Sequence, residues 1–286
     1  MPFARVADAE LYYEAIGEGP PLVLTPGGVQ NGLEVIRSLA GSLAVGRRVI
    51  AYDRRFAGRS RSPLVVQTWD LAVDDLIGLL DQLGIESADL GGGATGAAIS
   101  LRAAARYPAR VRRVFASNVN GGRICTAFLM MAFIKSLEIA ETKGIPALLE
   151  AYHPGDRYAP FVPPLARTDP TFRIGFAAMD PRDFAEVMRR TIAALFEGEY
   201  VAIALTESLL RSIEAPCLLL HGAGDDIHPR QVAERVGALI PDVRWSGVAS
   251  FRRPENLAIF ARDVLAFLDG GSLDGTTPIE RARHAR

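Results

Sequence analysis

The hydrophobic positions of this 286-residue chain follow two patterns that alternate along it. Between residues 69 and 83, apolar side chains at 71, 73, 76, 77, 80 and 83 recur at helical spacing, and Gly84 ends the predicted helix. Short apolar runs typical of buried strands lie at residues 11–14, 21–24, 48–53, 87–90, 114–117 and 217–221. Strands that alternate with amphipathic helices predict right-handed crossovers and a mostly parallel sheet, which is an α/β architecture.

The alternation stops between residues 118 and 213. Residues 183–196 carry apolar side chains at 184, 187, 188, 192 and 195, which predicts a helix, and we find no strand pattern in this block. We therefore expect a helical insertion over the strand ends, where α/β sheets bind ligands. The predicted organisation is a core over residues 1–122 and 213–270, a helical cap over residues 123–212 and a tail over residues 271–286. Five cap side chains are expected to face a cavity in part: Phe128, Met131, Phe133, Phe172 and Phe176.

Composition narrows the range of partners. The formal net charge of −1 provides no bulk attraction for nucleic acid or an anionic membrane, and no apolar run reaches about 18 residues. The two cysteines, Cys125 and Cys217, lie far apart without a metal-binding or disulfide spacing. We expect a cytoplasmic protein with a small-molecule substrate or ligand, no metal and no other cofactor. A homodimer contact through the Met- and Phe-rich residues 126–133 stays open.

One stretch has the form of a catalytic turn. Residues 90–100 read LGGGATGAAIS, in which an apolar strand runs through small residues into an alanine-rich helix. Such a strand–turn–helix carries the nucleophilic serine of a G-x-S-x-G elbow. Three further segments accompany it: YDRRFAGRS at 52–60, YPARV at 107–111, and a last helix that begins PEN at 254 and ends FL at 268.

In this order and spacing, these motifs resemble the α/β-hydrolase superfamily of the helical-cap type over residues 10–269. The resemblance implies an α/β-hydrolase fold, with a mostly parallel central sheet flanked by helices and a helical cap insertion. It puts Ala94 at the nucleophile position, since Pro108 follows it by 14 residues, the usual spacing in the family. Thr95 at that position would shorten the spacing by one residue and turn the helix face by about 100°.

The resemblance also implies an oxyanion hole, which stabilises negative charge on a carbonyl oxygen. The backbone N–H of Thr95, directly after the nucleophile position, would be one donor. The second donor is expected near Gly28 in the loop after the strand at 21–24, with Gly27 and Gly93 beside it.

The resemblance also implies a catalytic triad of serine, histidine and an acid, and this sequence keeps only part of it. The segment LLLHGAGD at 218–225 matches the family's strand followed by G-x-x-D, which puts Asp225 at the position of the acid. The family's histidine, expected before the last helix, is missing from residues 247–255. His228, three residues after Asp225, is the candidate that could partly compensate, whereas His221 closes a buried strand and is interpreted as a core residue. The two other histidines, His153 and His284, are expected to lie outside the site.

Without a serine and the usual histidine, the ordinary acyl-enzyme mechanism cannot operate. We expect an enzyme acting on a small, largely apolar oxygenated substrate by lyase, decarboxylase, isomerase or cyclase chemistry. Two alternatives remain open: a serine-to-alanine form of a true hydrolase of esters or carbon–carbon bonds, and a pseudo-hydrolase that binds a ligand without turnover. A scaffold that uses the Met- and Phe-rich face of the cap is a third.

Overall fold

The computed structural model describes residues 2–153, 156, 159–222, 224–248, 251 and 254–271. Its centre is an eight-stranded sheet in the order β1-β2-β4-β3-β5-β6-β7-β8. The strands are β1 (Phe3–Val6), β2 (Ala9–Ile16), β3 (Pro21–Thr25), β4 (Arg48–Tyr52), β5 (Ala88–Gly93), β6 (Val111–Ser117), β7 (Cys217–Leu220) and β8 (Val243–Ser246). β2 pairs antiparallel with β1 and β4, and all other pairs are parallel. The predicted mostly parallel sheet is therefore confirmed.

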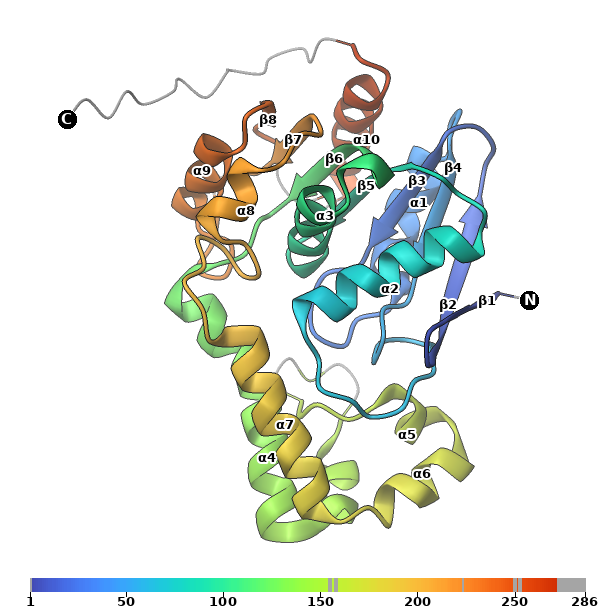
Figure 1. Ribbon diagram of the computed structural model, residues 1–286, viewed down its shortest axis with the longest axis vertical. Coiled ribbons are helices and arrows are strands. Elements are labelled where there is room, and N and C mark those ends of the chain that lie inside the picture. The colour runs from blue at the N-terminus through green and yellow to red at the C-terminus, as the bar shows by residue number, and fades with distance from the viewer. Residues whose placement is uncertain are drawn as a thin grey trace, which may run out of the picture.

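Helices cover both faces of this sheet (Figure 1). One face carries α2 (Trp69–Gln82), α3 (Thr95–Arg106), α8 (Glu207–Arg211) and α9 (Arg230–Leu239), and the other carries α1 (Arg37–Leu43) and α10 (Pro254–Leu268). Short 3-10 turns, η1 (Leu33–Ile36) and η2 (Pro108–Arg110), precede α1 and β6. Alternate side chains of one strand enter opposite cores, as Leu22 and Val23 of β3 do. The sheet is thus the middle of three layers.

The hydrophobic pattern did not predict two of the strands, β1 and β8, or two of the helices, α1 and α9. β1 and β8 are four-residue edge strands, and half of β8 is polar, so neither shows a continuous apolar run. α1 and α9 contain 7 and 10 residues, close to the lower limit at which a helical period can be recognised. Tertiary pairing, rather than local pattern, determines these elements.

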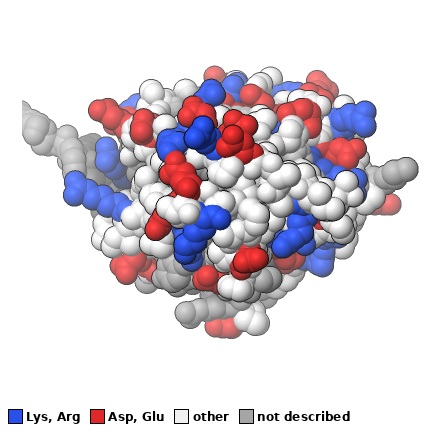
Figure 2. All heavy atoms as spheres, turned by 90° about the horizontal axis from the view of Figure 1, so that it is seen from below, with Lys and Arg blue, Asp and Glu red and all other residues white. Residues whose placement is uncertain are grey.

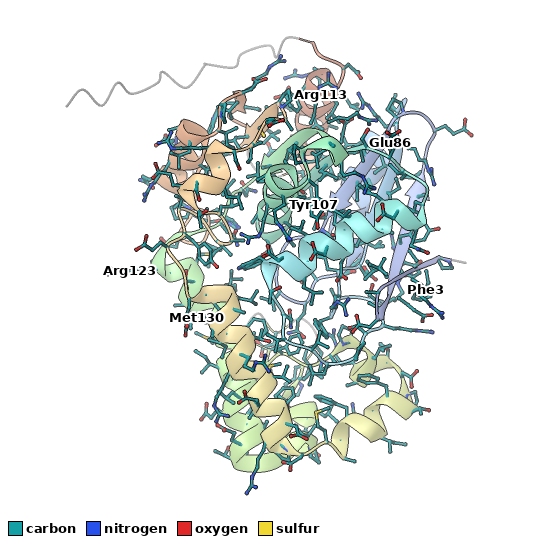
Figure 3. All side chains as sticks on the ribbon, viewed as in Figure 1. Phe3, Glu86, Tyr107, Arg113, Arg123 and Met130 are labelled. Carbon is teal, nitrogen blue, oxygen red and sulfur yellow. The ribbon has the colours of Figure 1, made fainter. Side chains whose placement is uncertain are left out.

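Between β6 and β7 the chain forms the helical segment, which we define as residues 122–211. Besides α8 it contains α4 (Gly122–Ala151), α5 (Pro164–Thr168), α6 (Pro170–Ala177) and α7 (Pro181–Phe196). Gly144, with φ +84°, breaks α4 just before Pro146. α4 and α7 pack along each other at one end of the sheet (Figure 1). In Figure 3, Arg123 and Met130 mark the N-terminal half of α4, which leads away from the end of β6.

Hydrogen bonds fix the helical segment against the layers around the sheet. The indole Nε1 of Trp69 donates to the carbonyl of Leu195 at 2.9 Å. On the other side, the side-chain amide of Gln30 donates to the carbonyl of Pro160 and accepts from the N–H of Val162, both at 3.2 Å. Since Gln30 lies two residues after Gly28, this second attachment links the loop after β3 directly to the helical segment.

The outer surface of the helical segment carries both signs of charge. Figure 2 looks onto this end of the molecule, and Lys or Arg side chains are interspersed there with Asp and Glu. Across the described part of the chain, no helix is both long and apolar enough to span a membrane. The predicted tail beyond residue 271, with His284, lies outside the described residues.

Candidate active site

The turn after β5 has the backbone of a nucleophile elbow. Ala94 lies between the last residue of β5 and the first of α3, with φ 51° and ψ −117°, a conformation that L-residues rarely adopt. Its N–H donates to the carbonyl of Ser117 on β6 at 2.9 Å, and its carbonyl accepts from Ala98 in α3 at 3.2 Å. Thr95 is already the first helical residue, so the strained position is Ala94.

Glycines allow the layers to approach at this turn. A Cβ on Gly96 would lie 2.0 Å from the Thr25 carbonyl oxygen, so only glycine lets α3 pack this closely against the end of β3. A Cβ on Gly27 would lie 2.5 Å from the Gly93 carbonyl oxygen and 3.3 Å from the Ala94 Cβ. The loop after β3 therefore touches the elbow directly.

Gly28 gives this loop its shape. Its φ of +81° is in the left-handed region, and an added Cβ would lie 2.4 Å from the Asn31 amide nitrogen. Arg54, after β4, donates from Nη2 to the carbonyls of Gly28 and Val29. Gly27, Gly28, Gly93 and Thr95 all line one cavity together with Ala94. The two predicted oxyanion residues, Gly28 and Thr95, thus line the same cavity as Ala94.

The loop after β7 brings an acid and a histidine together. One carboxylate oxygen of Asp225 accepts from the N–H groups of Ile227 and His228, at 2.8 and 2.7 Å. The His228 Nδ1 lies 3.1 and 3.2 Å from the two carboxylate oxygens. Burial opposes ionisation of Asp225, but these contacts with His228 outweigh it and hold the pKa of the carboxyl below its ordinary value.

This pairing fixes the proton arrangement of the imidazole. With Nδ1–H donated to the carboxylate, the Nε2 of a neutral His228 is an acceptor without a hydrogen-bond partner among the described residues, as a general base requires. The His228 side chain is 24% exposed and the Asp225 side chain 64%. The acid is therefore more open to solvent than the imidazole that it orients.

His221, directly after β7, contacts the same loop through its ring. It is buried, and its Nε2 lies 3.1 Å from the carbonyl oxygen of His228. Burial lowers the pKa of His221, which keeps the ring neutral, and its Nδ1 has no partner among the described residues. These contacts make His221 a structural core histidine.

A cavity of about 1260 Å³ joins these parts. Its lining includes Ala94, Gly28, Asp225 and His228, so the elbow, the oxyanion loop and the acid–histidine pair face one space. From the helical segment, Phe128 and Met131 reach this cavity, as predicted. Phe133 lines a smaller neighbouring cavity instead. Phe172 and Phe176 stack on each other at 6.4 Å and line neither of these two cavities.

Three cavity residues were not anticipated from the sequence. Asn120, after β6, is buried, and its side-chain oxygen has no hydrogen-bond partner among the described residues. Arg167 comes from α5. Phe251 lies in the stretch 247–255, from which the family's histidine is missing, and it lines the cavity with an apolar ring. The missing histidine before the last helix was the feature of the sequence that could have drawn attention to this stretch and to Phe251.

Comparisons with known proteins agree with the fold. Residues 20–140 match the family model described as "alpha/beta hydrolase fold". A protein named "Putative carbamate hydrolase RutD" from Caulobacter sp. (strain K31) is 30% identical over 234 residues, covering 78% of this chain and 81% of the relative. The 2-hydroxy-6-oxo-2,4-heptadienoate hydrolase of Pseudomonas putida (strain F1) is 29% identical over 246 residues and 79% of each chain. Among solved structures, the enol-lactonase from Burkholderia xenovorans LB400 superposes with a TM-score of 0.64 at 22% identity, covering 94% of this chain and 100% of the other.

Proposed function

We propose that this chain, which belongs to the α/β-hydrolase fold family, is a hydrolase of small carbonyl compounds that uses water in place of a serine nucleophile. The observation that carries the proposal is the His228–Asp225 pair, whose imidazole lines the same cavity as Ala94 and the oxyanion loop. The relatives are named hydrolases, which favours hydrolysis over lyase, decarboxylase, isomerase or cyclase chemistry. We keep the expected substrate class, small, largely apolar and oxygenated, and infer that its oxygen belongs to a carbonyl group.

The reaction would begin at Nε2 of His228. This nitrogen takes a proton from water while the water oxygen attacks the substrate carbonyl carbon. Negative charge then develops on the carbonyl oxygen, and the backbone N–H groups near Thr95 and Gly28 would stabilise it. The bond to the leaving group breaks as the imidazolium returns its proton to that group. One water is consumed, and no covalent bond to the protein forms.

Ala94 is what excludes an acyl-enzyme. Its methyl group has neither a nucleophilic atom nor a proton to transfer, and Thr95 begins α3 with a side chain that is 4% exposed. Water can occupy the space above a methyl group, where a serine hydroxyl would otherwise lie. The expected kinetics are therefore steady turnover without a burst.

Short-chain p-nitrophenyl esters and carbamates test this function directly. His228→Ala is expected to lower kcat/KM by about 10²- to 10⁴-fold, the usual contribution of a general base. His153→Ala is the matched control, because His153 is an exposed histidine beyond the end of α4. Hydrolysis that is unaffected by His228→Ala would refute the assignment of the base.

A fluorophosphonate probe separates the alternatives. The proposed mechanism predicts no labelling of the wild-type chain, whereas stoichiometric labelling of Thr95 would show that a covalent route operates. Ala94→Ser is expected to become labelled if the oxyanion hole and His228 can support serine chemistry. A wild-type chain that only gains thermal stability with ligand, and turns over none of the panel, would instead be a pseudo-hydrolase.

A further inference from the structure

A second cavity lies on the other side of the oxyanion loop. Its volume is about 50 Å³, and it shares Gly28, Val29, Thr95 and Leu129 with the larger cavity. Its remaining wall includes apolar side chains from α2 and the helical segment, such as Trp69 and Phe133, together with the paired charges of Arg55 and Asp75. This small cavity therefore adjoins both residues that the proposed function assigns to the oxyanion hole.

One cationic side chain, Arg54, lines this cavity without an ion-pair partner. Its Nη2 donates to the carbonyls of Gly28 and Val29, which carry no net charge. Its Nε is buried without a partner. Its Nη1 makes no hydrogen bond within the described part of the chain, and Arg54 is one of the residues that line the cavity. Part of the guanidinium therefore has no hydrogen-bond partner.

The carboxylates near Arg54, Asp75 and Asp53, bind other groups. Asp75 forms a two-point ion pair with Arg55, with both hydrogen bonds at 2.8 Å. Asp53 accepts the backbone N–H groups of Leu33 and Arg59, at 2.5 and 2.6 Å. No carboxylate of the described residues lies within ion-pair distance of Arg54.

Arg54 is partly buried, and no ion pair within the described residues offsets its charge. Desolvation lowers the pKa of Arg54, yet a guanidinium keeps its proton in proteins. The hydration that Arg54 loses is therefore not replaced by a counter-ion. An anionic group in the cavity would supply the missing partner, and Nη1 offers it a charged hydrogen bond.

We propose that Arg54 and the small cavity form a subsite for the carboxylate of a short, otherwise apolar ligand. The volume of about 50 Å³ exceeds the roughly 10–15 Å³ that a cavity needs to hold one water molecule. The cavity therefore has room for a group larger than water, such as a carboxylate on a short carbon chain. The next atoms of the ligand reach Gly28 and Thr95, where the carbonyl would react. The subsite adds a carboxylate to the substrate class and rests on the proposed function for the ligand's role as a substrate.

Propanoate and propanamide test the subsite, because they match in shape and differ in charge. Calorimetric titration at neutral pH and low ionic strength is expected to give at least about tenfold tighter binding for propanoate. Arg54→Met should remove this preference. Arg167→Met is the matched control, since Arg167 lines only the larger of the two cavities, and it should keep the preference.

A second variant protects the test against misfolding of Arg54→Met. Ala72 lines the small cavity, and Ala72→Val should fill it and abolish propanoate binding while leaving Arg54 in place. Equal binding of propanoate and propanamide by the wild type would overturn the proposal. So would a preference that survives Ala72→Val, or one that is lost in Arg167→Met and kept in Arg54→Met.

Binding does not require turnover, so the two proposals fail separately. His228→Ala should retain propanoate binding while it loses hydrolysis. A chain that binds propanoate through Arg54 but hydrolyses none of the esters or carbamates would overturn the proposed function and leave the subsite intact.

Discussion

Replacing Ala94 by glycine should stabilise the protein. Ala94 has φ 51° and ψ −117°, and a non-glycine residue in such a region costs on the order of 1–3 kcal/mol. Glycine removes that strain but makes the unfolded chain more flexible, which costs about 0.4–1 kcal/mol. The methyl group is only partly buried, so its loss subtracts little. The expected net gain is about 0.5–2 kcal/mol in the free energy of unfolding.

Urea unfolding followed by circular dichroism measures this difference. Ala98→Gly is the matched control, because Ala98 is fully buried within α3. Lost helix propensity of about 1 kcal/mol and a lost buried methyl of about 0.8 kcal/mol should destabilise that variant by roughly 2 kcal/mol. The midpoints should move in opposite directions, with unchanged slopes. An Ala94→Gly protein less stable than the wild type would refute the claim that the elbow is strained.

Three further changes probe the packing, a buried histidine and the link to the helical segment. Gly96→Ala should lower the stability of the protein by about 2–3 kcal/mol, because the added Cβ would lie 2.0 Å from a β3 carbonyl oxygen. Gly41→Ala is the control: Gly41 has open space around it, so this variant should raise the stability by about 0.5–1 kcal/mol, and thermal unfolding measures both. His221 has a folded pKa below its ordinary 6.5, so the unfolded chain binds the proton first and stability should fall as the pH drops through 6.5. Unfolding titrations should show a smaller drop for His221→Gln, and an equal drop would contradict this account. Gln30→Leu removes both bonds to the linker before α5 and should speed amide exchange at Val162, with unchanged exchange counting against the link.

Local patterns predicted much of the fold and one half of the site. The elbow could be recognised because a strand, small residues and a helix are consecutive in the chain, from 88 to 106. Asp225 and His228 could be paired because they lie three positions apart, and a turn in between suffices to bring the imidazole to the carboxylate. In both cases, the contacts that matter form between residues close in sequence.

The other half of the site depends on long-range contacts that no spacing reveals. Arg54 belongs to a motif that identified the family, yet its contact with Gly28 joins residues 26 positions apart and requires β3 and β4 to be adjacent in the sheet. Its lack of a carboxylate partner depends further on Asp75 being paired with Arg55. The charge of Arg54, which has no ion-pair partner among the described residues, can therefore be recognised only in the folded structure.

His228 comes from the loop after β7 and not from the segment before the last helix, and this determines which contacts hold its imidazole. A base located before the last helix would depend on how that segment packs, but in this chain Phe251 comes from there and packs its ring 5.3 Å from that of Phe260. His228 is instead held by the carboxylate of Asp225 on its own loop, while His221 contacts its carbonyl from the end of β7. The imidazole and its acid are therefore held by the same loop. If His228 is the base that we propose, one loop supplies both the base and the carboxylate that orients it, so the segment before the last helix does not have to contribute a histidine.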